Sequence, residues 1–214
     1  MTSMPSRSEK QMALLATSNT ADYNFHHDCS VVLDHPISEV FTILAHGDNI
    51  ERVVRLSDLC TDFELLDSDM VVTPDSAPLA ESRVRTEPAS TLSSEEGKIE
   101  GHPRQYFRFQ ETIPLVFGLT QKKVEIVGAQ TWDTIAKVAL YETVTDQRIV
   151  VWKLRALKEI EDDGSKKTTV IETIRGRCPT WMKPIVQMAT VKGHRCVGCF
   201  SLLSSQCYLY NNVK

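Results

Sequence analysis

Hydrophobic and polar residues alternate along residues 25–33. A period of two over this length is typical of a strand with one buried face. Pro36 then suits a first helical position, and the apolar residues within 40–44 form a single stripe. Gly47 ends this helix, and Asp48 can cap a second short one. The pattern therefore predicts that a strand and two short helices open the fold.

Beyond Leu59 the pattern changes to short strand-like runs, separated by segments rich in turn residues. The predicted strands are residues 60–66, 82–86, 105–113, 122–132, 137–144, 147–159 and 167–174. The charged segment 161–165 is typical of a hairpin tip between the last two of them. Because sequential strands with short connections pair most simply as neighbours, the pattern favours an antiparallel meander.

The last part of the chain has a helical period instead. Thr180 can cap a helix, and Pro184 falls within its first turn, where a missing N–H costs little. Apolar or small residues then recur every three or four positions, at Met182, Val186, Ala189, Gly193, Cys196, Val197, Phe200, Leu203 and Cys207. This predicts an amphipathic helix of roughly 28 residues and about 42 Å, long enough to cross a sheet.

This order of elements resembles that of the START-like (SRPBCC) superfamily, which includes the birch pollen allergen fold and polyketide cyclase and aromatase domains. Residues 34–41 (DHPISEVF) are similar to the start of the first helix in that family, and residues 168–176 (TTVIETIRG) to its last strand. The resemblance extends over about residues 23–210. Segments 132–133, 139–142 and 151–155 are similar to a fungal branch of the superfamily.

The resemblance implies an α+β helix-grip fold, in which a curved antiparallel sheet of about seven strands grips a long C-terminal helix. Residues 1–22, rich in Ser, Thr, Met and Ala, are expected to be a disordered leader. One domain then spans 23–210, and 211–214 form a short tail. The family also implies a cavity between sheet and helix for an apolar small molecule, such as a lipid or a polyketide-like metabolite, for binding or transfer.

If the apolar face of each strand points toward the helix, aromatic and aliphatic side chains line that cavity. The predicted ligand-binding residues are Phe107, Phe109, Trp132, Trp152, Leu154, Met182, Val186 and Phe200. Leu140, Val144 and Val150 are expected on the same face. The alternative interpretation is that these side chains fill a dry core, as such stripes usually do.

Three carboxylates, Glu111, Glu142 and Glu172, alternate with apolar residues on the predicted strands. Burial raises the pKa of a carboxyl group, so each is a candidate general acid or base. The alternative function is therefore a cyclase or dehydratase of secondary metabolism that uses these interior carboxylates. The competing structural explanations are pairing with Arg108, Arg155 or Arg175 and a one-residue slip in register, which would move each side chain to the other face.

The six cysteines are expected to be reduced, because no secretory signal is apparent. Cys196 and Cys199 with His194 suggest a metal site at first sight. On a helix, however, His194 is displaced by about 200° from Cys196, so the three cannot surround one ion. His27 on the first strand is a further candidate polar anchor for a ligand. We expect no metal and no cofactor.

The composition of the chain limits which classes of partner it can be expected to bind. The 214 residues, 42% hydrophobic and 24% charged, suit one domain with a sizeable core. The net charge of −4 and the lack of a basic motif argue against nucleic acid. No stretch approaches the roughly 20 apolar residues of a membrane span, so we expect a cytoplasmic protein with at most transient membrane contact. The sequence leaves the oligomeric state open.

Overall fold

The computed structural model describes residues 23–71, 78–80, 101–115, 120–162 and 164–187. In chain order, the elements are β1 (Phe25–Leu33), α2 (Ile37–Leu44), the 3₁₀ turn η2 (Gly47–Asn49), α3 (Ile50–Val54), β2 (Cys60–Val71), β3 (His102–Leu115), β4 (Thr120–Asp133), β5 (Val138–Thr145), β6 (Val150–Asp162), β7 (Ser165–Arg177) and the 3₁₀ turn η6 (Thr180–Met182). The opening strand and two short helices are as predicted.

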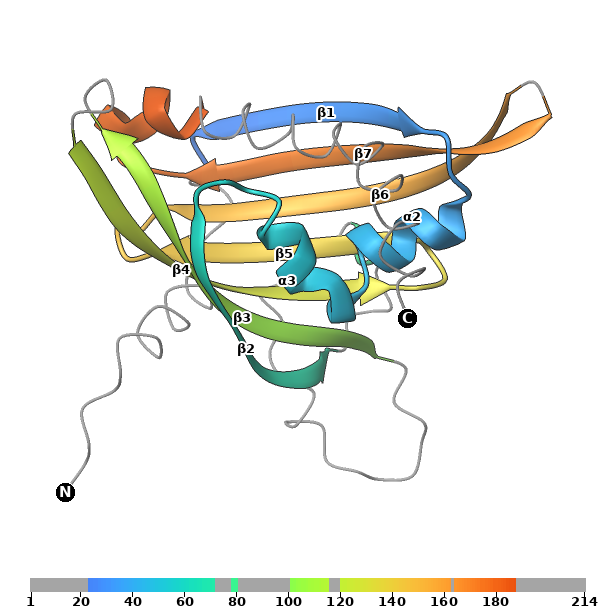
Figure 1. Cartoon of the computed structure of the whole chain (residues 1–214), viewed down its shortest axis with the longest axis horizontal. Helices are drawn as coiled ribbons and strands as arrows, with labels where there is room; N and C mark the ends of the chain where they lie inside the picture. The colour runs from blue at the N-terminus through green and yellow to red at the C-terminus, as the bar shows by residue number, and fades with distance from the viewer. Residues whose placement is uncertain (1–22, 72–77, 81–100, 116–119, 163, 188–214) are drawn as a thin grey trace, which may run out of the picture.

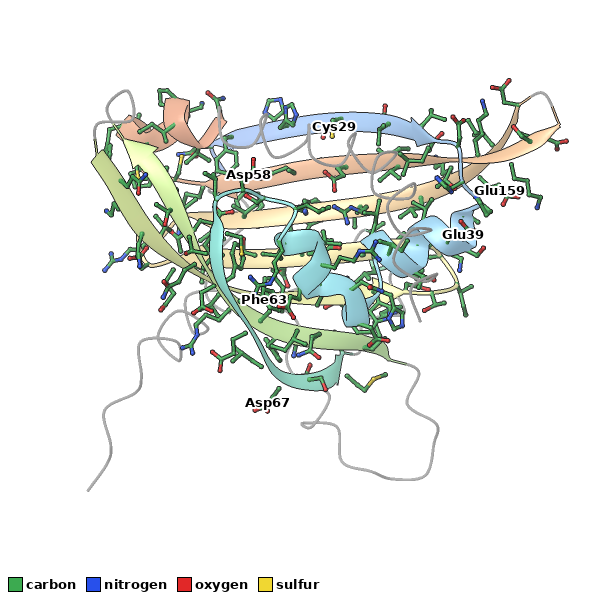
Figure 2. The ribbon with its side chains drawn as sticks, viewed as in Figure 1. Cys29, Glu39, Asp58, Phe63, Asp67 and Glu159 are labelled. Atoms are coloured by element: carbon green, nitrogen blue, oxygen red, sulfur yellow. The ribbon has the colours of Figure 1, made fainter. Side chains whose placement is uncertain are left out.

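All seven strands form one antiparallel sheet in the order β1-β7-β6-β5-β4-β3-β2. Strands β2 to β7 are therefore a meander, and β1 joins it at the β7 edge. Figure 1 shows that the sheet is curved and that α2 and α3 lie across one of its faces. Figure 2 shows Cys29 on β1 and Phe63 on β2, the two edge strands. The predicted helix-grip architecture, with a curved antiparallel sheet, is confirmed.

Two predicted elements lie wholly or partly outside the described residues. One is the strand at 82–86. The other is most of the C-terminal helix, of which the structure describes η6 and a helical continuation at residues 183–187. Within the part of the chain that is described, every helix is too short or too polar to span a membrane.

Helix α2 packs on the sheet through a continuous apolar cluster. Its buried residues Val40, Phe41 and Leu44 contact a set of sheet residues that includes Trp132. Gly47 follows directly, and a Cβ atom there would lie only 2.4 Å from Cη2 of Trp132. The glycine thus allows the chain to pass tightly over the indole ring.

The opposite face of the sheet is also apolar at its centre. Leu140 and Trp152 are buried there with Val71 and Leu79, and Tyr23 and Leu154 pack against them. Strand β5 is consequently buried on both faces along nearly its whole length. Burial on both faces removes the polar alternation that normally identifies the inward side of a strand.

Candidate functional site

A cavity of about 360 Å³ lies on the sheet face that carries α2 and α3. Residues of β3 to β7 form its walls, together with α3 and residues 182–186. Its size is within the range of about 300 to 1,000 Å³ of small-molecule sites.

Strands β3 and β4 supply an aromatic and aliphatic wall. Phe107 and Phe109 lie two residues apart on the inward face of β3, with ring centroids 6.0 Å apart. Phe63 on β2 pairs in register with Phe109 and stacks against Phe107, with ring centroids 6.2 Å apart. Val124 and Ile126 continue this wall on β4. Packed aromatic rings give a binding surface that loses little conformational entropy when a ligand arrives.

Arg155 and Glu172 form a buried ion pair, of which Glu172 lines the cavity. Arg155 on β6 is 1% exposed, and its Nε donates to Oε1 of Glu172 on the paired position of β7, at 2.6 Å. The Arg155 guanidinium also donates to the backbone carbonyl of Leu44, as does the Tyr141 hydroxyl, at 2.6 Å. Leu44 is the last residue of α2, and a cation at this end compensates its unsatisfied carbonyls and dipole.

Lys153 lies beside this pair and lines the cavity. Its Nζ is 3.9 Å from Oε1 of Glu172 and 4.4 Å from the centre of the Tyr141 ring. Burial lowers the pKa of Lys153 to about 8, because the apolar surroundings disfavour the ammonium form. The Glu172 carboxylate opposes this shift, and the positive charge of Arg155 adds to it. Lys153 is therefore a lysine with an accessible neutral form at physiological pH.

Glu111 lines another part of the cavity. The Ser57 hydroxyl, just beyond α3, donates to Oε1 of Glu111 at 3.4 Å. Burial raises the pKa of Glu111, and the Ser57 hydrogen bond only partly offsets this effect. The site thus combines a carboxyl group whose pKa is raised by burial with a lysine whose pKa is lowered by burial.

The structure distributes the predicted site residues among three places. Of the predicted ligand-binding and catalytic residues, those that line the cavity are Phe107, Phe109, Met182, Val186, Glu111 and Glu172. Trp132 packs under α2 and η2 instead. Trp152 and Leu154 belong to the cluster on the opposite face, and Glu142 pairs with Trp152 in register there. Phe200 lies outside the described residues.

The prediction of which face points inward is wrong for β5 and β6. Thr143 and Val151 pair with each other and line the cavity, whereas Leu140, Val144 and Val150 point to the other side. Because both strands carry apolar residues at odd and even positions, hydrophobicity gave no sound basis for choosing a face. A choice wrong by one residue moves every side chain on the strand.

Lys153 and Tyr141 were missed for the same reason. The alternation placed Trp152 and Leu154 inward, which assigned their neighbours Lys153 and Arg155 to the other face of the strand. A signal in the sequence could have revealed Lys153. Lys153 and Arg155 alternate with the large apolar residues Trp152 and Leu154, and in a strand near the centre of the sheet one face must bury those charges.

The described part of the chain contains no group of three His, Cys, Asp or Glu side chains that is placed to hold a metal ion. Among the described cysteines, Cys60 and Cys178 carry free thiols. Cys196, Cys199 and His194 lie outside the described residues. His27 is half-buried on β1, pairs in register with Ile174, and is not among the residues that line the cavity.

No protein-family model and no curated protein sequence matches this chain. Solved structures do. The aromatase/cyclase Zhui from Streptomyces sp. R1128 aligns with a TM-score of 0.51 and 10% identity, covering 80% of this chain and 87% of that one. Norcoclaurine synthase from Thalictrum flavum, solved with dopamine and hydroxybenzaldehyde, aligns with a TM-score of 0.51 and 8% identity over 92% of this chain and 93% of that one.

The protein TTHA0849 from Thermus thermophilus aligns over 80% of this chain and 90% of its own, with 12% identity and a TM-score of 0.48. At these levels of identity the likeness concerns the path of the backbone. The side chains of the cavity therefore have to be interpreted from this chain alone.

Proposed function

We propose that this chain, which has the helix-grip fold of the START-like (SRPBCC) superfamily, binds an apolar small molecule in the cavity between β3–β7 and α3. The observation that carries the proposal is the cavity of about 360 Å³ with its wall of Phe107, Phe109 and aliphatic side chains. A preformed concave site with mainly apolar walls and a few polar groups is the usual form of a small-molecule site.

The charged groups indicate the kind of ligand. Arg155 and a protonated Lys153 together carry two positive charges, and Glu172 supplies one negative charge between them. A ligand with an apolar body and one oxygen acceptor would bury its body against the Phe107 wall and direct the oxygen toward Lys153. Placing an acceptor beside a partly desolvated ammonium group stabilises the complex more than the same contact in water.

A second candidate function is proton-transfer catalysis of the cyclase or dehydratase type, which Glu111 favours. This carboxyl lines the cavity and has a raised pKa, as a general acid requires. Glu172 fits this role less well because the short contacts from Arg155 occupy Oε1. Glu142 lies on the other face of the sheet, away from the cavity.

Fluorescence titration with an apolar dye such as anilinonaphthalene sulfonate tests the proposal. We expect saturable binding of one dye per chain. Val151→Trp should weaken binding about tenfold or more, equivalent to about 1.4 kcal/mol, because Val151 faces the cavity and the indole would fill it. Ile160→Trp is the matched control, since Ile160 is exposed farther along the same strand. Equal affinity of both variants, each with a wild-type circular dichroism spectrum, would contradict the cavity as the binding site.

A further inference from the structure

Among the described residues, Lys122 and Lys153 are the lysines that line the cavity. They differ in setting. Lys122 is exposed near the start of β4, whereas Lys153 lies in the middle of the sheet with its side chain 25% exposed. Lys158 on β6 is exposed outside the cavity and provides a reference amine on the same strand.

The contacts of Glu172 determine the state of Lys153. Two nitrogens of Arg155 contact Oε1 of Glu172 at 2.5 and 2.6 Å. Lys153 remains at 3.9 Å from the same oxygen, beyond hydrogen-bond distance. The carboxylate is thus committed chiefly to Arg155. The Lys153 amine keeps its lone pair available toward the cavity whenever it is neutral.

Among the described residues, the titratable groups that shift the pKa of Lys153 lie on its own strand β6, on the neighbouring β7 and on β1 beyond it. Burial is the largest effect and lowers its pKa, Arg155 on β6 lowers it further, and Glu172 on β7 and Cys29 on β1 oppose this shift. With a pKa of about 8, about a quarter of Lys153 is neutral at pH 7.5, against about one in a thousand for a lysine of ordinary pKa. The neutral amine is the form that attacks carbonyl carbon.

We infer that Lys153 is a covalent site for apolar aldehydes and ketones, which enter the cavity and condense with its amine. The amine nitrogen bonds to the carbonyl carbon, the carbonyl oxygen leaves as water, and a C=N bond forms. The imine takes up one proton from solution to become an iminium ion. Its positive charge then occupies the place of the original ammonium, beside the Glu172 carboxylate and the face of the Tyr141 ring.

This inference rests on the proposed function, because the cavity must hold the apolar body while the bond forms. The two are separated experimentally with a pair of probes. The probe 2-naphthaldehyde can form the imine, and 2-naphthalenemethanol has the same rings but no carbonyl group. Reduction with cyanoborohydride converts the imine into a stable amine, which intact mass spectrometry counts and peptide mapping assigns to one lysine.

We expect one adduct per chain at pH 7.5, assigned to Lys153 at a rate about tenfold or more above that of Lys158. The rate of labelling should rise with pH up to about 8, because the neutral fraction of the Lys153 amine grows most steeply as the pH approaches its pKa. Lys153→Met should abolish the saturable adduct and still bind 2-naphthalenemethanol. Lys158→Met, the matched control, should leave labelling unchanged.

Labelling of Lys153 no faster than Lys158, with the alcohol still bound, would overturn the imine site and leave the binding function standing. Labelling that is mapped to Lys122 would also overturn it. Failure of both naphthyl probes to bind the wild-type protein would contradict the imine site and the proposed function together.

Discussion

The buried pair of Arg155 and Glu172 allows a quantitative prediction. Their side chains are 1% and 3% exposed, and two guanidinium nitrogens contact one carboxylate oxygen at 2.5 and 2.6 Å. Glu172→Gln removes the negative charge and leaves the Arg155 cation buried. Breaking a buried pair from one side usually costs about 3–5 kcal/mol. The Gln amide oxygen can still accept one hydrogen bond, so we expect a loss near the low end, about 3 kcal/mol.

Urea denaturation followed by circular dichroism at pH 7.5 measures this loss. Glu159→Gln is the matched control, because Glu159 and Lys166 bridge the same two strands at 3.0 Å with side chains 37% and 68% exposed. Glu159 is labelled in Figure 2, near the tip of the β6–β7 hairpin. An exposed pair contributes about 1 kcal/mol or less. Equal losses for the two variants would refute the reasoning that Arg155 depends on Glu172.

A double variant separates the pair from general damage to the sheet. Arg155→Met combined with Glu172→Gln removes both charges of the pair, so the Arg155 cation is no longer left buried without its carboxylate. We therefore expect it to lose less stability than the sum of the two single variants, with a coupling free energy of about 1–3 kcal/mol. Additive losses would mean that Arg155 stabilises the fold mainly through the Leu44 carbonyl.

Three further changes have defined outcomes. Gly47→Ala should destabilise the protein by about 1–3 kcal/mol in thermal unfolding, because its Cβ would lie 2.4 Å from Trp132, and an unchanged melting temperature would contradict this packing. Lys153→Met should raise the free energy of unfolding at pH 7 by about 2–3 kcal/mol. The folded-state pKa of Lys153, about 8, lies below the ordinary value of 10.5, so the stability of the wild-type protein rises between these pH values. The stability advantage of the variant should therefore disappear by pH 11. A stability difference that does not change with pH would refute this. Glu111→Gln should stabilise the protein at pH 7 and lose that advantage in acid, because the raised pKa of Glu111 makes its ionisation unfavourable in the folded state. Urea denaturation at pH 3.5 and at pH 7 tests this. The same difference in free energy of unfolding at both pH values would contradict it.

The sequence predicted the fold well where one face of an element meets solvent. Residues 25–33 alternate, and the structure has β1 at Phe25–Leu33. The short helix after Pro36 is likewise present as α2. In both elements the order of apolar and polar residues reflects burial directly. A period of two or of 3.6 residues in the apolar positions is therefore sufficient to identify them.

The site was predicted only in part, because its polar groups depend on distant residues. Arg155 points inward because the Leu44 carbonyl, 111 residues earlier, and Glu172 compensate its charge. Such a pairing leaves no local pattern in the sequence. Lys153 lies on the same face of β6, so the wrong choice of inward face for this strand also concealed the lysine in the cavity. Phe107 and Phe109 were placed correctly because Arg108 between them points away from the cavity wall, to Glu64.

Intermolecular nuclear Overhauser effects from bound 2-naphthalenemethanol to the methyl groups of the protein test the central claim most directly. The account predicts contacts from the naphthyl protons to Ile126, Ile174 and Met182, which line the cavity. Contacts confined to Leu140 and Leu154, on the opposite face of the sheet, would contradict it.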